Sequence, residues 1–152
     1  MKKRDVRQKV LVIHGPNLNV LGKRNKAIYG NKTLKEINSL IEDRARELNI
    51  QVTMHQSNQE GELVDFVQAH AAQSDSIIVN PGALTHYGLS LRDALEDTGL
   101  PIIEVHLSNI HAREPFRRRS VIAGVAKGQV SGLGWYGYVA ALEHLVDLEK
   151  GG

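Results

Sequence analysis

The sequence predicts an α/β domain in which a five-stranded parallel sheet is covered by helices on both faces. Two apolar runs without alternation, at residues 10–13 (VLVI) and 76–80 (SIIVN), are typical of strands that are buried on both faces of a parallel sheet. Between such runs, apolar residues recur at spacings of three and four, which is the pattern of an amphipathic helix. Parallel strands need crossovers of this kind, so the alternation predicts one doubly covered sheet.

The first elements have clear sequence signals. His14-Gly15-Pro16 ends the first strand. Thr33 is followed three residues later by Glu36, a capping box, and the apolar stripe after it predicts a helix over residues 33–48. Alternation of apolar and polar residues in 50–56 (IQVTMHQ) then predicts a second strand nearer the edge of the sheet.

The same two patterns predict the other elements. They are helix 63–70, strand 76–80, helix 89–95, strand 101–106, strand 127–131 and helix 136–149. The fifth strand is ambiguous because the stretch around it is rich in glycine. The resulting order βαβαβαβαβα and the chain length favour a flavodoxin-like three-layer sandwich with strand order 2-1-3-4-5.

Length and composition fit a single domain over residues 1–152. With 152 residues and 41% hydrophobic content, the chain is long enough to bury a core of its own. Residues 1–8 (MKKRDVRQ) are polar, and we expect a disordered leader there. No apolar run approaches the roughly 20 residues of a membrane span, and the basic start lacks the apolar segment of a secretory signal. A cytoplasmic location without membrane contact is therefore expected.

Composition and missing motifs exclude several classes of function. The absence of cysteine excludes disulfides, thiol catalysis and cysteine-based metal sites. The net charge is only +2, and the basic run 117–119 is more typical of solvated or anion-binding arginines than of a nucleic-acid interface. The chain lacks the GxxxxGK[ST], HExxH and GxSxG motifs, and its first loop lacks GxGxxG, which disfavours a nucleotide site, a zinc site and a serine hydrolase.

Three polar loops follow the first, third and fourth strands, over residues 17–29, 80–86 and 106–117. In the predicted strand order these loops meet at the edge where open α/β sheets bind ligands. The first loop has about 18 residues, whereas such connections usually have roughly 2 to 6, and we interpret it as a lid. Its phenol, guanidinium and amide groups, with imidazole from the other loops, suit proton transfer on an anionic substrate. Taken singly, His106 could equally bond a neighbouring backbone group, and Tyr29 is more typical of a packing residue.

Several motifs in a fixed order allow a more specific prediction of the function. They are GPNLN with LG and Arg24 in 15–24, Tyr29-Gly30, QSN and EGE in 56–62, NPGA with Thr85-His86, LRDA in 91–94, EVHLSN in 104–109, and Arg113-Glu114 with Phe116-Arg117. In these motifs the chain resembles type II 3-dehydroquinate dehydratase over residues 9–148. The resemblance implies a flavodoxin-like lyase that converts 3-dehydroquinate to 3-dehydroshikimate in the shikimate or quinate pathway. The elimination is anti, passes through an enolate, and uses no metal or organic cofactor.

The resemblance also implies roles for individual residues. Tyr29 would be the base that takes the proton next to the ketone, and Arg24 beside it would favour the phenolate. Asn17 would hold a water that hydrogen-bonds the enolate oxygen. His106 would protonate the leaving hydroxyl, with Glu104 helping to orient it.

Further residues would bind the substrate. Asn80 and the backbone groups of Leu107 and Ser108 would hold its carboxylate, while His86 and Arg117 would bind the ring hydroxyls.

Two more residues depend on the lid and on the assembly. Arg113 resembles a second arginine on the lid side. Asp93 resembles a residue that reaches the site from a neighbouring subunit, in a family whose trimers stack into a dodecamer. Without the resemblance, Asp93 would be interpreted as an aspartate on a helix surface.

Two departures from the family pattern concern the lid and the pocket. Lys26 stands where the family usually has proline, and proline fixes φ and restricts the unfolded chain, so a more mobile lid is expected. The segment 84–88 (LTHYG) also differs from the usual residues around Thr-His. The alternatives are a noncatalytic small-anion binding protein on this scaffold and, less well matched, a flavin or signalling module.

Overall fold

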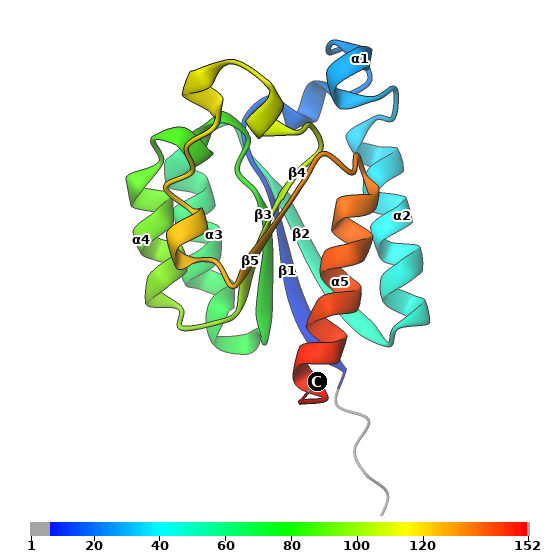
Figure 1. Cartoon of the computed structure of the whole chain (residues 1–152). Coiled ribbons are helices and arrows are strands. Elements are labelled where there is room, and N and C mark those ends of the chain that lie inside the picture. Colours follow the sequence, from blue (N-terminus) through cyan, green and yellow to red (C-terminus); the bar gives the residue numbers. More distant parts are fainter. Residues whose placement is uncertain (1–6, 152) are drawn as a thin grey trace, which may run out of the picture.

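The computed structural model describes residues 7–151, and its five strands form one parallel sheet (Figure 1). The strands are β1 (Gln8–His14), β2 (Ile50–Gln56), β3 (Ser76–Asn80), β4 (Ile102–His106) and β5 (Gly128–Ser131). They lie in the order β2-β1-β3-β4-β5, and every pairing is parallel. The predicted flavodoxin-like strand order is confirmed.

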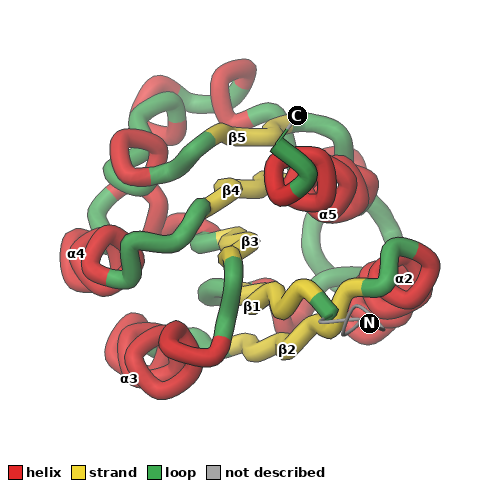
Figure 2. Tube along the Cα trace, turned by 90° about the horizontal axis from the view of Figure 1, so that it is seen from below, coloured by secondary structure: helices red, strands yellow, loops and turns green. Residues whose placement is uncertain are grey.

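Four long helices cover the sheet, two on each face (Figure 2). They are α2 (Leu34–Glu47) and α5 (Tyr136–Glu149) on one face, and α3 (Glu60–His70) and α4 (Leu89–Asp97) on the other. Successive residues of β1 point to opposite faces, so Val10 and Val12 join the core under α2 and α5, while Leu11 and Ile13 join the core under α3 and α4. This burial on both faces explains the unbroken apolar run.

Helix α2 begins at the predicted capping box. Thr33 Oγ1 accepts a hydrogen bond from Glu36 N at 3.2 Å, and Glu36 Oε1 accepts one from Thr33 N at 3.5 Å. Helix α5 has the predicted bounds, and β5 begins one residue later than expected. Helix α3 begins at Glu60, three residues before the expected start.

The first strand begins earlier than the apolar run. Gln8 pairs with Ile50 of β2, so the prediction of a disordered leader over residues 1–8 is wrong for Gln8. The backbone pairing with β2 holds this polar residue in the sheet. The part of that prediction that concerns residues 1–6 lies outside the described residues.

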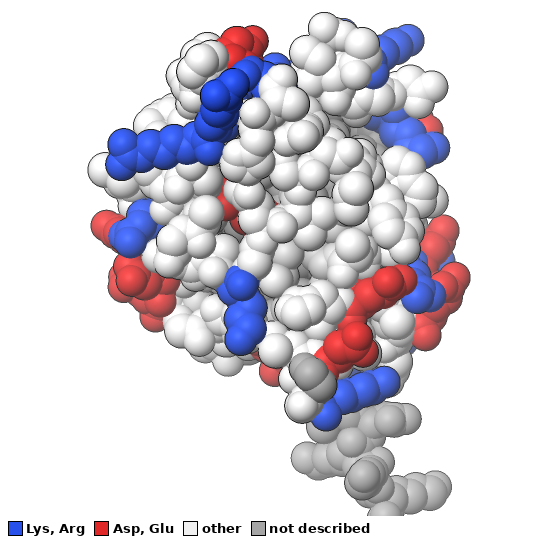
Figure 3. Space-filling view, in the orientation of Figure 1, with Lys and Arg blue, Asp and Glu red and all other residues white. Residues whose placement is uncertain are grey.

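The long first loop contains a short helix that was not predicted, α1 (Lys26–Tyr29). The side chain of Asn25 caps its N-terminus by accepting from Ala27 N at 3.1 Å, and Gly30, at φ 78°, ends it. In Figure 1, α1 lies at the end of the molecule to which the carboxyl ends of the strands point. Lys and Arg side chains gather at that end, with acidic side chains among them (Figure 3).

No helix within residues 7–151 is long and apolar enough to cross a membrane.

Candidate active site

A pocket opens at the carboxyl ends of β1, β3 and β4, where the strand order reverses between β1 and β3. All residues predicted to act in catalysis or to bind the substrate line it, except Asp93; Glu104, predicted to orient His106, lies behind His106. Its lining is Pro16, Asn17, Leu18, Arg24, Tyr29, Asn80, Gly82, Ala83, His86, His106, Leu107, Ser108, Ile110, Arg113 and Arg117. The three polar loops therefore converge as predicted.

Close backbone contact holds the first and third loops together. Gly15 N donates to Asn80 O at 2.7 Å, and a Cβ at Gly15 would lie 2.4 Å from Pro81 O. Gly82 has a φ of +58°, and a Cβ there would lie 2.9 Å from Pro16 O. Only glycine fits at these two points, so the backbones of the first and third loops can pack directly against each other beside the pocket.

Tyr29 is the last residue of α1, and its hydroxyl is the acceptor for two arginines. Arg24 Nη2 and Arg113 Nη1 each donate to the phenolic oxygen at 3.0 Å. The guanidinium carbon of Arg24 also lies 3.8 Å from the centre of the tyrosine ring. Both arginines therefore donate charge-assisted hydrogen bonds to the same oxygen.

Arg113 connects the lid to the loop after β4. Besides Tyr29, its Nη1 donates to Ser108 Oγ at 3.2 Å. The segment that contains α1 is thus bound to a loop more than 80 residues further along the chain. In this closed arrangement the phenol faces the same pocket as His106.

His106 and Glu104 lie two residues apart on β4, on the same face of the strand. His106 Nε2 lies 2.5 Å from Glu104 Oε2, and the carboxylate also accepts from Thr85 Oγ1 at 2.5 Å and from Ser120 Oγ at 2.9 Å. Burial alone would raise the pKa of Glu104, but the hydrogen bonds from His106 and Thr85 outweigh it and lower that pKa. A carboxylate only accepts hydrogen bonds, so His106 carries a hydrogen on Nε2.

Asn17 has a left-handed backbone, with φ 69°, which asparagine tolerates better than most residues. Its backbone N donates to Asn58 Oδ1 at 2.9 Å. Gln56 Nε2 donates to the same oxygen at 3.1 Å and to Gly15 O at 3.2 Å. The QSN segment therefore fixes the start of the lid.

The predicted substrate-binding side chains also have defined partners. Asn80 donates from Nδ2 to Tyr138 Oη at 3.0 Å and accepts at Oδ1 from Gly82 N at 3.2 Å. His86 Nδ1 donates to Arg119 O at 2.7 Å. Arg117 Nε donates to Glu114 Oε2 at 2.7 Å.

Asp93 lies on α4 and does not line the pocket. Its Oδ1 accepts from Arg92 Nη1 at 3.1 Å, and its side chain is 66% exposed. Its contribution to a neighbouring subunit stays a prediction.

Thr85, Asn58 and Ser120 support the site but were given no role from the sequence. Thr85 and Asn58 stand inside motifs that were recognised, so their position next to His86 and Ser57 was the available signal. Ser120 follows the arginine run, and no local pattern links it to Glu104, sixteen residues before it.

The charge of the pocket suits a small anion. Arg24, Arg113 and Arg117 line it, and the acidic Glu104 is already bonded to His106. No group of three or more His, Cys, Asp or Glu side chains that could hold a metal ion occurs in residues 7–151.

Comparison with known proteins agrees with this geometry. The family model described as dehydroquinase class II matches residues 8–146. A 3-dehydroquinate dehydratase of Roseiflexus castenholzii is 59% identical over 138 residues, which cover 91% of this chain and 88% of the relative. One of Halothermothrix orenii is 56% identical, with 95% of this chain and 97% of the relative covered.

Solved structures show the same likeness. The type II dehydroquinase of Butyrivibrio crossotus has a TM-score of 0.90 at 44% identity and covers 91% of this chain and 97% of its own. That of Propionibacterium acnes has a TM-score of 0.89 at 37% identity, with 92% and 97% covered. The resemblance seen in the sequence motifs is confirmed, and the chain belongs to the class II dehydroquinase family.

Proposed function

We propose that this chain dehydrates 3-dehydroquinate to 3-dehydroshikimate by an anti elimination through an enolate, in the shikimate or quinate pathway. The enzyme class, a type II 3-dehydroquinate dehydratase, follows from family membership and confirms the prediction from sequence. The observation that carries the proposal is the pairing, in one pocket, of a phenolic oxygen that two arginines contact with an imidazole that a buried carboxylate contacts.

The first step is proton removal by Tyr29. Its phenolic oxygen, which Arg24 and Arg113 contact, takes the proton from the carbon next to the ketone. The electron pair of the broken C–H bond moves to the ketone oxygen and gives an enolate. Asn17 holds a water that donates to this oxygen, and loss of such a donor typically costs on the order of a hundredfold in rate.

The second step is departure of the hydroxyl. A lone pair on the enolate oxygen re-forms the ketone C=O bond. The electron pair of the enolate C=C bond forms the new C=C bond, and the C–O bond to the leaving hydroxyl breaks. His106 gives a proton to the leaving oxygen, so that water departs, and Glu104 holds the imidazole in position for this transfer. Solvent then takes the proton from Tyr29 and returns one to His106. The sum is loss of one water, and no step needs a metal or an organic cofactor.

Binding of the substrate uses the polar groups at the strand ends. Asn80 and the backbone of Leu107 and Ser108 hold the carboxylate, and His86 and Arg117 bind the ring hydroxyls.

The assembly and location belong to the same proposal. Trimers stack into a dodecamer, Asp93 enters the site of a neighbouring subunit, and the enzyme works in the cytoplasm. The role of Asp93 in this proposal is supported by the high exposure of its side chain, which a second copy could reach.

The test follows the conjugated enone of 3-dehydroshikimate by absorbance, with purified protein, 3-dehydroquinate and EDTA. A steady rise that is blocked in His106→Ala and Tyr29→Phe supports the proposal. A flat trace with ligand still bound would favour the noncatalytic alternative, which nothing in the described residues supports.

A further inference from the structure

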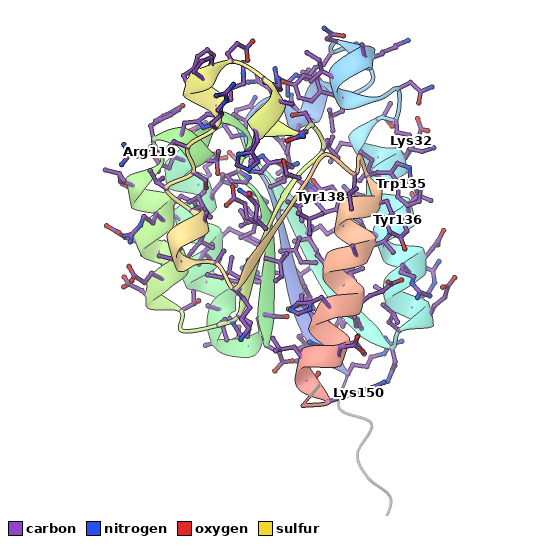
Figure 4. All side chains as sticks on the ribbon, in the orientation of Figure 1. Lys32, Arg119, Trp135, Tyr136, Tyr138 and Lys150 are labelled. Carbon is purple, nitrogen blue, oxygen red and sulfur yellow. The ribbon has the colours of Figure 1, made fainter. Side chains whose placement is uncertain are left out.

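A chain of hydrogen bonds runs through the core below the pocket and ends at Asn80. Asn38 of α2 contacts His14 at the end of β1, with 2.8 Å between Oδ1 and Nε2. His14 Nδ1 lies 2.9 Å from Tyr138 Oη of α5, and Asn80 Nδ2 donates to that oxygen at 3.0 Å. His14 and Tyr138 have no exposed surface, and Tyr138 projects from the first turn of α5 toward the sheet (Figure 4).

With Asn38 Oδ1 facing His14, the direction of each bond in the chain follows. Burial lowers the pKa of His14 to about 4, so the imidazole is neutral at pH 7 and carries one hydrogen. The Oδ1 of Asn38 only accepts, which places that hydrogen on Nε2. Nδ1 is then an acceptor, and Tyr138 uses its single hydrogen to donate to it. The Tyr138 oxygen can therefore only accept from the third partner, Asn80.

This direction determines how the carboxamide of Asn80 is oriented. Its nitrogen must face Tyr138, and its oxygen accepts from Gly82 N at 3.2 Å. A rotated amide would turn its nitrogen toward an N–H donor at Gly82 and lose both bonds. The second hydrogen on Asn80 Nδ2 has no partner among these groups, and the residue lines the pocket.

We infer that His14 and Tyr138 are positioning residues that lock the Asn80 carboxamide so that it presents an N–H donor to the substrate carboxylate. The inference rests on the proposed function, which gives Asn80 that ligand. A rotated amide would present an oxygen to the carboxylate, and two acceptors repel. The lock thus acts on substrate affinity through Asn80 and leaves the proton transfers at Tyr29 and His106 unchanged.

The experiment is a double-mutant cycle with Tyr138→Phe and Asn80→Ala, read by the enone assay. Tyr138→Phe is expected to raise KM roughly tenfold and to change kcat by less than about threefold, because it weakens one oriented hydrogen bond made equally in ground and transition states. In the Asn80→Ala background the same change is expected to alter KM by less than about twofold. A tenfold effect that persists without Asn80, or an unchanged KM in the single variant, would overturn the inference.

If Tyr138→Phe does not fold, the variants His14→Gln and His14→Leu provide a second test. Gln at position 14 still offers an acceptor to Tyr138, whereas Leu offers none and releases the Tyr138 hydrogen. Only the N–H of Gly82 then opposes rotation of the Asn80 carboxamide. His14→Leu is expected to raise KM by a similar factor and His14→Gln by much less. Equal KM values in the two variants would contradict the lock.

Two controls separate this inference from other causes. Val67→Ala removes buried volume from the core under α3 and α4, so it should lower the melting temperature without altering KM. Wild-type activity is measured first: an inactive wild type would refute the proposed function and the inference with it. Normal wild-type turnover with an unchanged KM in Tyr138→Phe would refute the inference alone.

Discussion

Acidification from pH 7.5 to 5.0 is expected to remove about 2 kcal/mol from the free energy of unfolding through His14 alone. Burial lowers the pKa of His14 from 6.5 to about 4 in the folded chain, while the unfolded chain keeps the ordinary value. Between these two values the unfolded state binds a proton that the folded state does not. The stabilisation is therefore complete above about pH 6.5 and is lost as the pH falls toward 4.

The magnitude follows from the two pKa values. At pH 5.0 the unfolded histidine is almost fully protonated and the folded one about a tenth protonated, which gives a difference of about 2 kcal/mol. The full shift would correspond to about 3 kcal/mol below pH 4. Glu104, whose pKa is lowered from 4.5, acts in the same direction, but most of its effect falls below pH 5.0.

The assay is urea unfolding of wild type and His14→Gln at both pH values. Other titrating groups affect both proteins equally, so the difference between their pH dependences isolates His14. We expect the wild type to lose about 2 kcal/mol more than the variant between pH 7.5 and 5.0. Equal losses would show that His14 is not held neutral by burial, and would remove the basis for the direction of the buried hydrogen-bond chain.

Three further predictions concern the lid and the acid. Ser120→Ala removes a hydrogen bond that Glu104 accepts, so the pKa of Glu104 should rise and the acidic limb of the pH profile of kcat should move to higher pH. An acidic limb at the same pH as in the wild type would contradict this. Lys26 is the first residue of α1 and the preceding residue has ψ 107°, both compatible with proline, so Lys26→Pro should stabilise the lid by roughly 0.4–1 kcal/mol. Slower proteolysis of the loop or a lower KM would show this, and no change in either would refute it. Asn58→Ala removes the acceptor for Asn17 N and should lower kcat on the order of tenfold, whereas Asn58→Asp, which keeps an acceptor, should lower it less. Equal activity of the two variants would exclude this positioning role.

Elements with a local signal were predictable from the sequence. The apolar run of β1 and the capping box at Thr33 act within a few residues, so both could be located directly. Helix α1 has only four residues and no periodicity to detect, and it depends on the Asn25 cap. Gln8 is polar and joins β1 only because β2 lies beside it, which is a tertiary effect.

The candidate site shows the same division. Tyr29 and His106 stand inside motifs and at strand or lid positions that the sequence reveals. Tyr138 comes from the last helix, and its partners His14 and Asn80 precede it by 124 and 58 residues. Their contact exists only after the sheet and α5 have packed, so no window of sequence could have predicted it.

The two proton-transferring groups of the proposed reaction are built into parts of very different rigidity. His106 belongs to a central region of the sheet and is fixed by a buried carboxylate, whereas Tyr29 ends a one-turn helix on a surface loop and is held by Arg24 and Arg113. The acid is thus held by the sheet, whereas the position of the base depends on the two hydrogen bonds that Arg24 and Arg113 make to it. If this loop opens to admit substrate or release product, Tyr29 leaves the pocket while His106 stays in place. Turnover then includes the rate of a loop motion, and substitutions in that loop can change the speed of the enzyme without touching its chemistry.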